Sequence, residues 1–355
     1  MPGASHHRNR SSVFTRPRVS LLAASLLLFS GCESGGPGAA RNLTLGGPPA
    51  KVSYQEPPAP APYGGPGVSL APEVKPAPDA PTVDIHLDVT HTKMSVAPGV
   101  EYVAWTFGGV VPGPVLHVRQ GERVRFSLTN RSGETASLAM PMPHSIDIHA
   151  AMVNPADKYQ SVGPGGTIRF EWTPNYPGVF MYHCATPPML HHIAAGMFGM
   201  VIVEPRDGYP GRPERQYALI QSELYLTRAA SGLYSVDSLA AAEKRPTYVV
   251  FNGTPTRHVD EPLKARAGER VRLYVLNAGP NGTSSFHVLG TIMDRVWIDG
   301  NPANELHGLQ TVLLPASGGA IVEFVIPEDG IYSFVDHEFA DAERGATGHI
   351  DALGP

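Results

Sequence analysis

The chain has 355 residues, among them 38 glycines, 36 prolines, 15 histidines and only two cysteines. Because glycine and proline disfavour helices, this composition excludes a helix bundle or a coiled coil as the main architecture. Two cysteines are too few for a disulfide framework or an all-cysteine zinc site. The formal net charge of −5 indicates no nucleic-acid partner, since a protein that binds phosphate backbones is usually strongly basic. The length predicts about two domains.

The N-terminus has the pattern of an export signal. Residues 6–18 are basic, residues 19–30 are mostly apolar, and Gly31 and Cys32 follow. A basic segment, a short apolar core and a small residue are typical of a secretory signal. The apolar run is too short to span a bilayer, which needs about 20 residues. We expect residues 1–32 to be a lipoprotein signal with Cys32 lipidated, which places the protein in the periplasm or on the outer membrane. A plain cleaved signal with an incidental cysteine is the alternative.

Residues 33–80 have the composition of a linker. Between residues 31 and 80, glycine and proline are far more frequent than in a packed domain. Such a segment buries few side chains and favours extended, partly polyproline-like conformations. We therefore expect residues 33–80 to be a tether that holds the following domains away from a membrane.

From residue 81 the sequence predicts an all-β fold. Short runs alternate apolar and polar residues and are bounded by glycine, proline or asparagine, which is typical of strands in a β-sandwich or barrel. The clearest runs are VDIHLDV (83–89), VLHVRQ (115–120), RVRFSLTN (123–130), TIRFEW (167–172) and VFMYHC (179–184).

Two segments of this region recur later in the chain. GERVRFSLTN returns as GERVRLYVLN, and GGTIRFEWTPNYPGVFMY returns more loosely as SGGAIVEFVIPEDGIYSF. The copies begin at residues 121 and 268 and at residues 165 and 317. Two ordered matches at similar offsets indicate two tandem homologous domains, which we place at residues 81–205 and 213–355, with a glycine- and proline-rich connector between them.

One cysteine, two histidines and a methionine predict a copper site in the first domain. His192 lies eight residues after Cys184, and Met197 lies thirteen residues after Cys184. All three belong to a loop between two predicted strands. A thiolate, two imidazoles and a weak thioether are the ligands of a blue-copper electron-transfer centre. The second imidazole must come from an earlier strand, and His144 is the candidate. His191 competes with His192, which we prefer for its spacing to Met197.

Strand geometry predicts a second metal beside the first. Successive side chains of a strand point to opposite faces, so His144 shares a face with Ile146 and Ile148. His149, with Asp147, faces the other way, as does His183 relative to Cys184. We expect His149 and His183 to bind a second metal, with Asp147 next to it. Six further histidines fit no such cluster, and we expect them to be structural: His86, His91, His117, His258, His307 and His349.

These residues resemble the motifs of copper-containing nitrite reductases, a family of two-domain cupredoxins that work as homotrimers. The family motifs read His-x-x-Asp-x-His and then His-Cys, a proline-rich loop, His and Met, and the likeness covers residues 81–355. The resemblance implies two tandem cupredoxin-like Greek-key β-sandwich domains. It implies type 1 copper on His144, Cys184, His192 and Met197, and type 2 copper on His149 and His183.

The second domain carries the rest of the resemblance. SSFHVLG (284–290) is similar to the family strand that bears a catalytic histidine, here His287, with Leu289 over the substrate. FVDHEF (334–339) is similar to the segment that supplies the third type 2 ligand, here His337, to the neighbouring subunit. Asp147 and His287 are then the catalytic residues that deliver protons.

The resemblance implies one-electron reduction of nitrite to nitric oxide, with electrons from a small cupredoxin or c-type cytochrome. Two alternatives stay open, a non-catalytic electron carrier and a related copper reductase or oxidase acting on another small substrate. Laccase-type chemistry is disfavoured, since no His-x-His occurs and Ala185 follows Cys184. The chain departs from the family at AMPMP (139–143) and AMVNPADKYQSV (151–162), which border the predicted metals.

Overall fold

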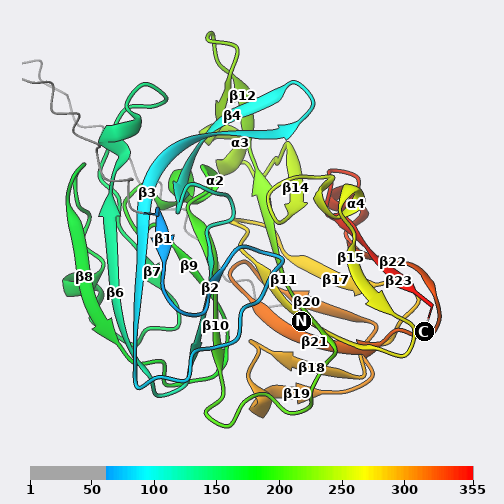
Figure 1. Ribbon diagram of the computed structural model, residues 1–355. Helices are drawn as coiled ribbons and strands as arrows, with labels where there is room; N and C mark the ends of the chain where they lie inside the picture. Colours follow the sequence, from blue (N-terminus) through cyan, green and yellow to red (C-terminus); the bar gives the residue numbers. More distant parts are fainter. Residues whose placement is uncertain (1–60, 355) are drawn as a thin grey trace, which may run out of the picture. The chain divides into compact units, whose positions relative to one another are not determined.

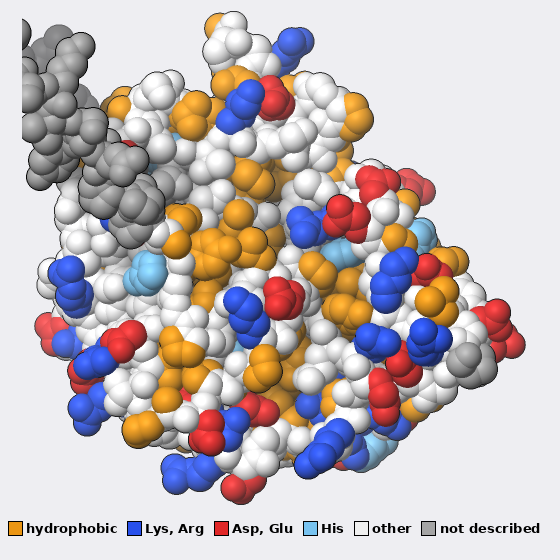
Figure 2. Space-filling view, in the orientation of Figure 1, with side chains coloured by type: hydrophobic (Ala, Val, Ile, Leu, Met, Phe, Trp, Pro, Cys, Tyr) orange, Lys and Arg blue, Asp and Glu red, His pale blue; other side chains and the backbone are white. Residues whose placement is uncertain are grey.

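The computed structural model describes residues 61–354, and Figure 1 shows their arrangement. The predicted signal, Cys32 and the first part of the tether lie outside the described residues. Strands dominate and form four sheets, which confirms the all-β prediction. Within this part of the chain, no helix combines the length and apolar character needed to cross a membrane. Figure 2 shows acidic and basic side chains interspersed over one face, with apolar side chains gathered toward its middle.

Two sheets face each other in the first sandwich, drawn in blue to green in Figure 1. One has the order β12-β13-β4-β3-β6-β8, with β1 paired to β3, and the other has the order β2-β5-β10-β9-β7. Their strands are β1 Tyr63–Gly64, β2 Val68–Ser69, β3 Thr82–Ala97, β4 Val100–Phe107, β5 Val115–Arg119, β6 Arg123–Asn130, β7 Asp147–Ile148, β8 Thr167–Trp172, β9 Gly178–His183, β10 Phe198–Glu204, β12 Leu226–Arg228 and β13 Tyr234–Val236.

The second sandwich, drawn in yellow-green to red, repeats this plan. Its sheets have the orders β14-β11-β16-β21-β18-β19 and β15-β23-β22-β17-β20. Their strands are β11 Arg215–Leu224, β14 Tyr248–Phe251, β15 Leu263–Arg266, β16 Arg270–Asn277, β17 Ser284–Val288, β18 Arg295–Ile298, β19 Glu305–Leu306, β20 Thr311–Leu314, β21 Gly319–Val325, β22 Gly330–Asp336 and β23 Thr347–Leu353.

Short helices connect these strands. They are η1 Ser132–Thr135, α1 Pro155–Lys158, α2 Met189–Ala194, α3 Ser238–Ala242, α4 Arg257–Asp260, η2 Pro302–Asn304 and α5 Phe339–Ala342. Helix α2 lies between Cys184 and Met197, two of the predicted type 1 ligands, and carries a third, His192.

Alternation of apolar and polar residues explains the cores. In β6, the alternating apolar side chains of Val124, Phe126 and Leu128 are buried, while Arg123 and Arg125 between them are exposed. The repeated segments occupy matching places, since β6 pairs antiparallel with β8 and its copy β16 pairs antiparallel with β21. The sequence repeat is therefore a repeat of strand pairing.

One hairpin from the second half of the chain joins a sheet of the first sandwich. The hairpin of β12 and β13 belongs to the second half by sequence, yet β13 pairs with β4 of the first sandwich through Tyr234 and Tyr102. The first sandwich's sheet thus continues into the region that we assigned to the second domain.

The tether prediction is wrong for residues 61–80. This stretch forms β1 and β2, which pair with β3 and β5, and Val68 and Ala77 are buried. The Ala218 N–H of β11 also donates to the Pro72 carbonyl. Proline and glycine bias a segment away from regular structure, but edge pairing and a few buried side chains suffice to order it. The first sandwich therefore begins near residue 61.

Candidate metal centres

Three of the predicted type 1 ligands converge in the first sandwich. Their donor atoms lie within 4.8 Å of one another. The Cys184 Sγ atom is 3.2 Å from His192 Nδ1 and 4.0 Å from His144 Nδ1, and the two Nδ1 atoms are 3.3 Å apart. All three side chains are buried. Two imidazoles and one thiol thus point at a common centre that water does not reach.

The loop between β9 and β10 holds this arrangement. The Cys184 N–H donates to the Met197 carbonyl, and the Met197 N–H donates to the His192 carbonyl, each at 3.1 Å. Helix α2 turns the buried His192 toward Cys184, whereas His191 makes a 2.7 Å hydrogen bond with Ser238. The structure therefore brings His192 and not its neighbour to the thiol. Met197 is also buried in this core.

The donor set fits copper. Sulfur and imidazole are soft and intermediate ligands that copper accepts together. The Nε2 atoms of His144 and His192 are buried without a hydrogen-bond partner, so each ring makes its polar contacts through Nδ1. Burial raises the pKa of the Cys184 thiol, while hydrogen bonds from Ser145 and Thr186 oppose the rise. A metal that displaces this proton would supply the charge that stabilises the thiolate.

Ser145 is a contact that the sequence did not reveal. Its N–H donates to Cys184 Sγ at 3.4 Å, and its hydroxyl accepts from the Ala185 N–H at 3.1 Å. The residue lies between His144 and Asp147 in the first motif, and a backbone donor leaves no mark on residue type. Ser145 thus orients the sulfur and the chain that follows it.

The second cluster lies on the other side of the same strand. Asp147 of β7 is paired with His183 of β9, and His149 follows directly after β7. The Nε2 atoms of His183 and His149 are 3.1 Å apart, and Asp147 Oδ2 is 4.0 Å from His183 Nε2. The predicted division of His144 and Cys184 from His149 and His183 therefore holds in three dimensions.

Hydrogen bonding prepares one ring of this cluster to bind a metal. The His183 Nδ1–H donates to the Cys184 carbonyl at 2.9 Å, which leaves Nε2 free as a lone-pair donor. Burial and His183 lower the pKa of His149, while Asp147 opposes the shift. His149 is therefore neutral near neutral pH, the form that coordinates metals. The cluster borders solvent, which suits a centre that keeps an open position for substrate.

His287 and His337 lie together elsewhere on the chain. Their ring centroids are 5.6 Å apart, and the His287 Nδ1 atom hydrogen-bonds the Gln310 carbonyl at 2.5 Å. His337 is exposed and is not among the closely spaced donors of the Asp147 cluster. Leu289, predicted to lie over the substrate, is 44% exposed. Within one chain, the structure therefore does not bring His337 to His149 and His183.

The two departures from the family pattern enclose His144. Val162, which ends the segment 151–162, exchanges two backbone hydrogen bonds with His144 at 3.0 and 2.9 Å. The Asn130 amide donates to the carbonyls of Met142 and Val162. Both unusual segments are thus bonded to Asn130 of β6, and the segment 151–162 is also bonded to the backbone of His144.

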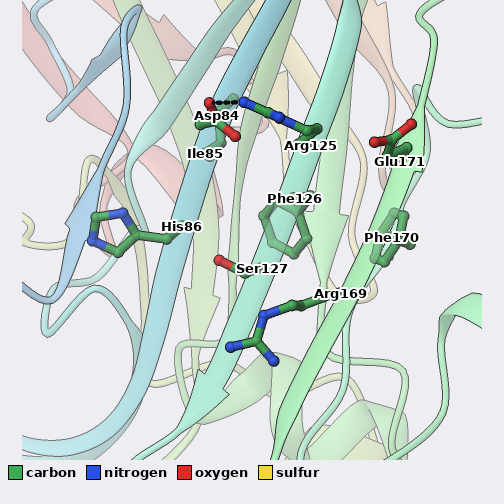
Figure 3. Close-up of a pocket in the computed structure, with 9 residues that line it drawn as sticks. All are labelled: Asp84, Ile85, His86, Arg125, Phe126, Ser127, Arg169, Phe170 and Glu171. Carbon is green, nitrogen blue, oxygen red and sulfur yellow. Dashed lines mark hydrogen bonds and ion pairs between the residues drawn. The ribbon is translucent and has the colours of Figure 1, made fainter.

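One hollow lies away from both clusters. It has a volume of about 650 Å³ on the outer face of β3, β6 and β8, and Figure 3 shows its lining. None of its described lining residues is a predicted ligand. Strand register sets Arg125 between Asp84 and Glu171, and the Arg125–Asp84 ion pair is drawn in Figure 3. Cross-strand charge pairing accounts for this surface without a ligand.

Comparison with known proteins agrees with the two clusters. Residues 88–208 match a family model described as multicopper oxidase. The chain is 39% identical to a copper-containing nitrite reductase of Neisseria meningitidis serogroup B over 297 residues, 80% of this chain and 73% of the relative. It is 32% identical to one of Cereibacter sphaeroides over 280 residues, 70% of each chain.

A solved copper nitrite reductase of Nitrosomonas europaea has 37% sequence identity and a TM-score of 0.69, covering 77% of this chain and 94% of that one. Multicopper oxidase structures at 24% identity and below share the fold alone. By its identity to relatives over most of its length, the chain belongs to the copper-containing nitrite reductase family.

Proposed function

We propose that this protein reduces nitrite to nitric oxide, with one electron and two protons entering and one water leaving. The observation that carries the proposal is the pair of donor clusters that meet at the C-terminal end of β9. Cys184 belongs to one cluster and His183 to the other, so a single peptide bond joins them. An electron carrier needs only the first cluster. The second, with its carboxylate and its access to solvent, gives a place for a substrate.

The two clusters of donor atoms and the family resemblance together support an assignment of the copper ligands. His144, Cys184, His192 and Met197 would hold the buried type 1 copper, while His149, His183 and, from a neighbouring subunit, His337 would hold the type 2 copper. Copper in these sites supplies one-electron transfer at the first and Lewis-acid binding of an anion at the second. The His183 Nδ1–H donates to the Cys184 carbonyl, which ties the imidazole of the second cluster to the backbone of the cysteine in the first.

Asp147 and His287 handle protons. Asp147 is partly exposed beside the second cluster, where its carboxylate takes a proton from solvent and gives it to the bound oxyanion. The His287 Nδ1–H donates to the Gln310 carbonyl. The Nε2 atom is therefore the ring nitrogen left for a substrate. An imidazole suits this role because its ring nitrogen can hold a proton and pass it to a reacting oxygen. Leu289 supplies apolar surface over the substrate.

A homotrimer completes the second site. His337 is exposed and paired with His287 in its own chain, and the cluster of Asp147, His149 and His183 borders solvent. In a closed cyclic assembly, each subunit presents His337 and His287 to the next, so every site is built in the same way.

Export and anchoring complete the proposal. The basic and apolar start of the chain, followed by Cys32, supports secretion and a lipid anchor on the membrane. The protein then works in the periplasm or at the outer membrane, where a cupredoxin or c-type cytochrome supplies electrons. Mass spectrometry of the purified protein tests this, since an acylated N-terminal Cys32 is expected.

Copper electron paramagnetic resonance with nitrite titration tests the function. We expect two copper signals per subunit, of which only the type 2 signal changes as nitrite is added. Nitric oxide should form when reduced protein meets nitrite. A lone type 1 signal that nitrite leaves unchanged would contradict the proposal and favour the electron carrier.

A further inference from the structure

The proposed type 1 ligands have no exposed edge of their own. His144 and His192 are both 0% exposed, so an electron donor touches neither imidazole directly. Trp105 of β4 covers them instead. Its ring centroid lies 5.6 Å from that of His144 and 4.9 Å from that of His192, in edge-to-face contact with both. Since Trp105 is itself partly exposed, its indole joins both imidazoles to the protein surface.

Trp105 lies in a hollow of about 380 Å³ that both halves of the chain build. Strand β4 and residues 137–139 contribute from the first half, and the β12–β13 hairpin contributes from the second. His191 also lines the hollow, held by its hydrogen bond with Ser238 and packed 4.8 Å from the Trp105 ring. None of the described residues that line it is an acid, a lysine or an arginine.

We propose that Trp105 is the residue through which the type 1 centre receives its electron, and that the hollow docks a small redox protein with an uncharged, apolar face around its own redox centre. This inference rests on the proposed function, which requires an external one-electron donor. The step oxidises the donor by one electron and reduces the type 1 copper by one. No bond forms or breaks and no proton moves.

The character of the lining selects this partner. A charged donor face would lose hydration in the hollow and find no opposite charge there, which is costly. An apolar face gains by removing exposed apolar surface from water. Leu138 and Met140 extend that surface with exposures of 38% and 83%. Contiguous exposed apolar surface of this kind marks protein–protein contacts, in which tryptophan and tyrosine contribute strongly.

Binding to copper-free protein tests the docking surface without any turnover. Calorimetry with reduced azurin as the single-domain cupredoxin probe should give an affinity that changes little between low and high salt. Ser235, an exposed residue of the lining, is the position for a matched pair. Ser235→Asp should weaken binding about tenfold, because it adds an unpaired charge to an apolar interface, while Ser235→Thr should not. Strong salt dependence, or equal binding by both variants, would overturn the docking surface.

Stopped-flow reduction of the type 1 absorbance by the same donor, without nitrite, tests Trp105. Trp105→Leu should slow the reduction at least about tenfold, because the aromatic contact at the interface is lost, while Trp105→Phe keeps most of the rate. Dithionite needs no docking surface and should reduce all variants at similar rates. Tyr176→Leu, an exposed aromatic residue that is not part of the hollow, is the control with an unchanged rate.

The outcome is independent of nitrite chemistry. Equal rates in wild type and Trp105→Leu, with the type 1 spectrum intact, would overturn the role of Trp105. If the leucine variant fails to bind copper, Trp105→Met replaces it, since the longer and more flexible methionine side chain adapts to the space of the indole without an aromatic ring. Failure of the wild type to reduce nitrite would remove the proposed function but would not alter these rates.

Discussion

In the first sandwich the residue after β9 is Cys184, and in the second the equivalent residue at the end of β22 is Asp336. The equivalence follows from register, since Asp147 pairs with His183 and His287 pairs with Val335. Even the supporting contact is shared. The N–H two residues before Asp147 donates to Cys184 Sγ, and the N–H two residues before His287 donates to Asp336 Oδ1.

Cys184 and Asp336 occupy equivalent places in the two sandwiches but have different neighbours. Asp336 is buried and accepts from the Gln221 amide at 2.7 Å, from the Ser285 N–H at 2.9 Å and from the Glu338 N–H at 3.1 Å. These donors satisfy its carboxylate within the fold. Cys184 has weaker partners, and two imidazole nitrogens face it. The first position is therefore built for a metal and the second for hydrogen bonding, which also fixes the neighbouring His337.

Loss of the first position should have the largest effect. Cys184→Ser should abolish the type 1 absorbance and lower nitrite turnover with a chemical donor more than about 100-fold. Loss of a residue that only hydrogen-bonds a metal ligand usually costs about 10- to 100-fold, and Cys184 is itself a predicted ligand. The type 2 signal in electron paramagnetic resonance should persist, as the control. Turnover that survives without type 1 absorbance would show that electrons reach the second cluster by another route.

The equivalent positions of Asp147 and His287 predict matched effects. Asp147→Asn and His287→Ala should each lower turnover by about 10²–10⁴-fold, since each removes a positioned proton donor. Steady-state assays give the rates, and metal analysis with electron paramagnetic resonance verifies that both coppers remain bound. Full activity in either variant would remove that residue from proton delivery.

In metal-free protein, substitutions at Asp336 and Cys184 should lower the free energy of unfolding by different amounts. Asp336→Ala should lower the free energy of unfolding by about 2–4 kcal/mol, because it leaves buried donors such as the Gln221 amide unsatisfied. Cys184→Ala should cost only about 1 kcal/mol, as expected for removing a small apolar group. Urea unfolding followed by circular dichroism measures both. Equal losses would show that Asp336 is not held by these hydrogen bonds.

Each sandwich also buries a histidine outside the metal clusters, and both should make the fold sensitive to acid. Burial lowers the pKa of His117 and of His258 from 6.5 to about 4. Between these values the unfolded chain binds a proton that the folded chain does not, so stability is full above pH 6.5 and falls as the pH drops toward 4.

At pH 5 each histidine should lower the free energy of unfolding by about 2 kcal/mol relative to neutral pH. Urea unfolding of the metal-free protein at pH 7.5 and pH 5 measures this loss. His117→Gln and His258→Gln, which do not titrate, should each lose less stability on acidification than the wild type. An unchanged loss in either variant would show that its histidine is not held neutral by burial.

Much of the first metal centre could be predicted from local sequence. The spacing of Cys184, His192 and Met197 places three ligands on one loop, and strand alternation separates His144 from His149. The strands predicted at 123–130 and 167–172 match β6 and β8. Local pattern failed at residues 61–80, where pairing with β3 and β5 outweighs a composition rich in proline and glycine.

Contacts between distant segments were beyond such reasoning. Trp105 belongs to no motif. Its ring reaches the imidazoles of His144 and His192 only because β4 packs against α2 and the segment that contains His144. The hairpin β12–β13 crosses to the first sandwich because an edge of β4 is free to pair with it.

The sequence by itself determined the all-β class, the repeat, the two clusters of copper-binding residues and the resemblance to nitrite reductases. These features depend on residue type and short spacing, which strand periodicity turns into geometry. Only the tertiary structure decided between His191 and His192, revealed the covering role of Trp105 and placed His337 beside His287, away from His149 and His183 of its own chain. Those outcomes depend on which surfaces pack together, and side-chain packing across distant segments is not encoded in any local pattern.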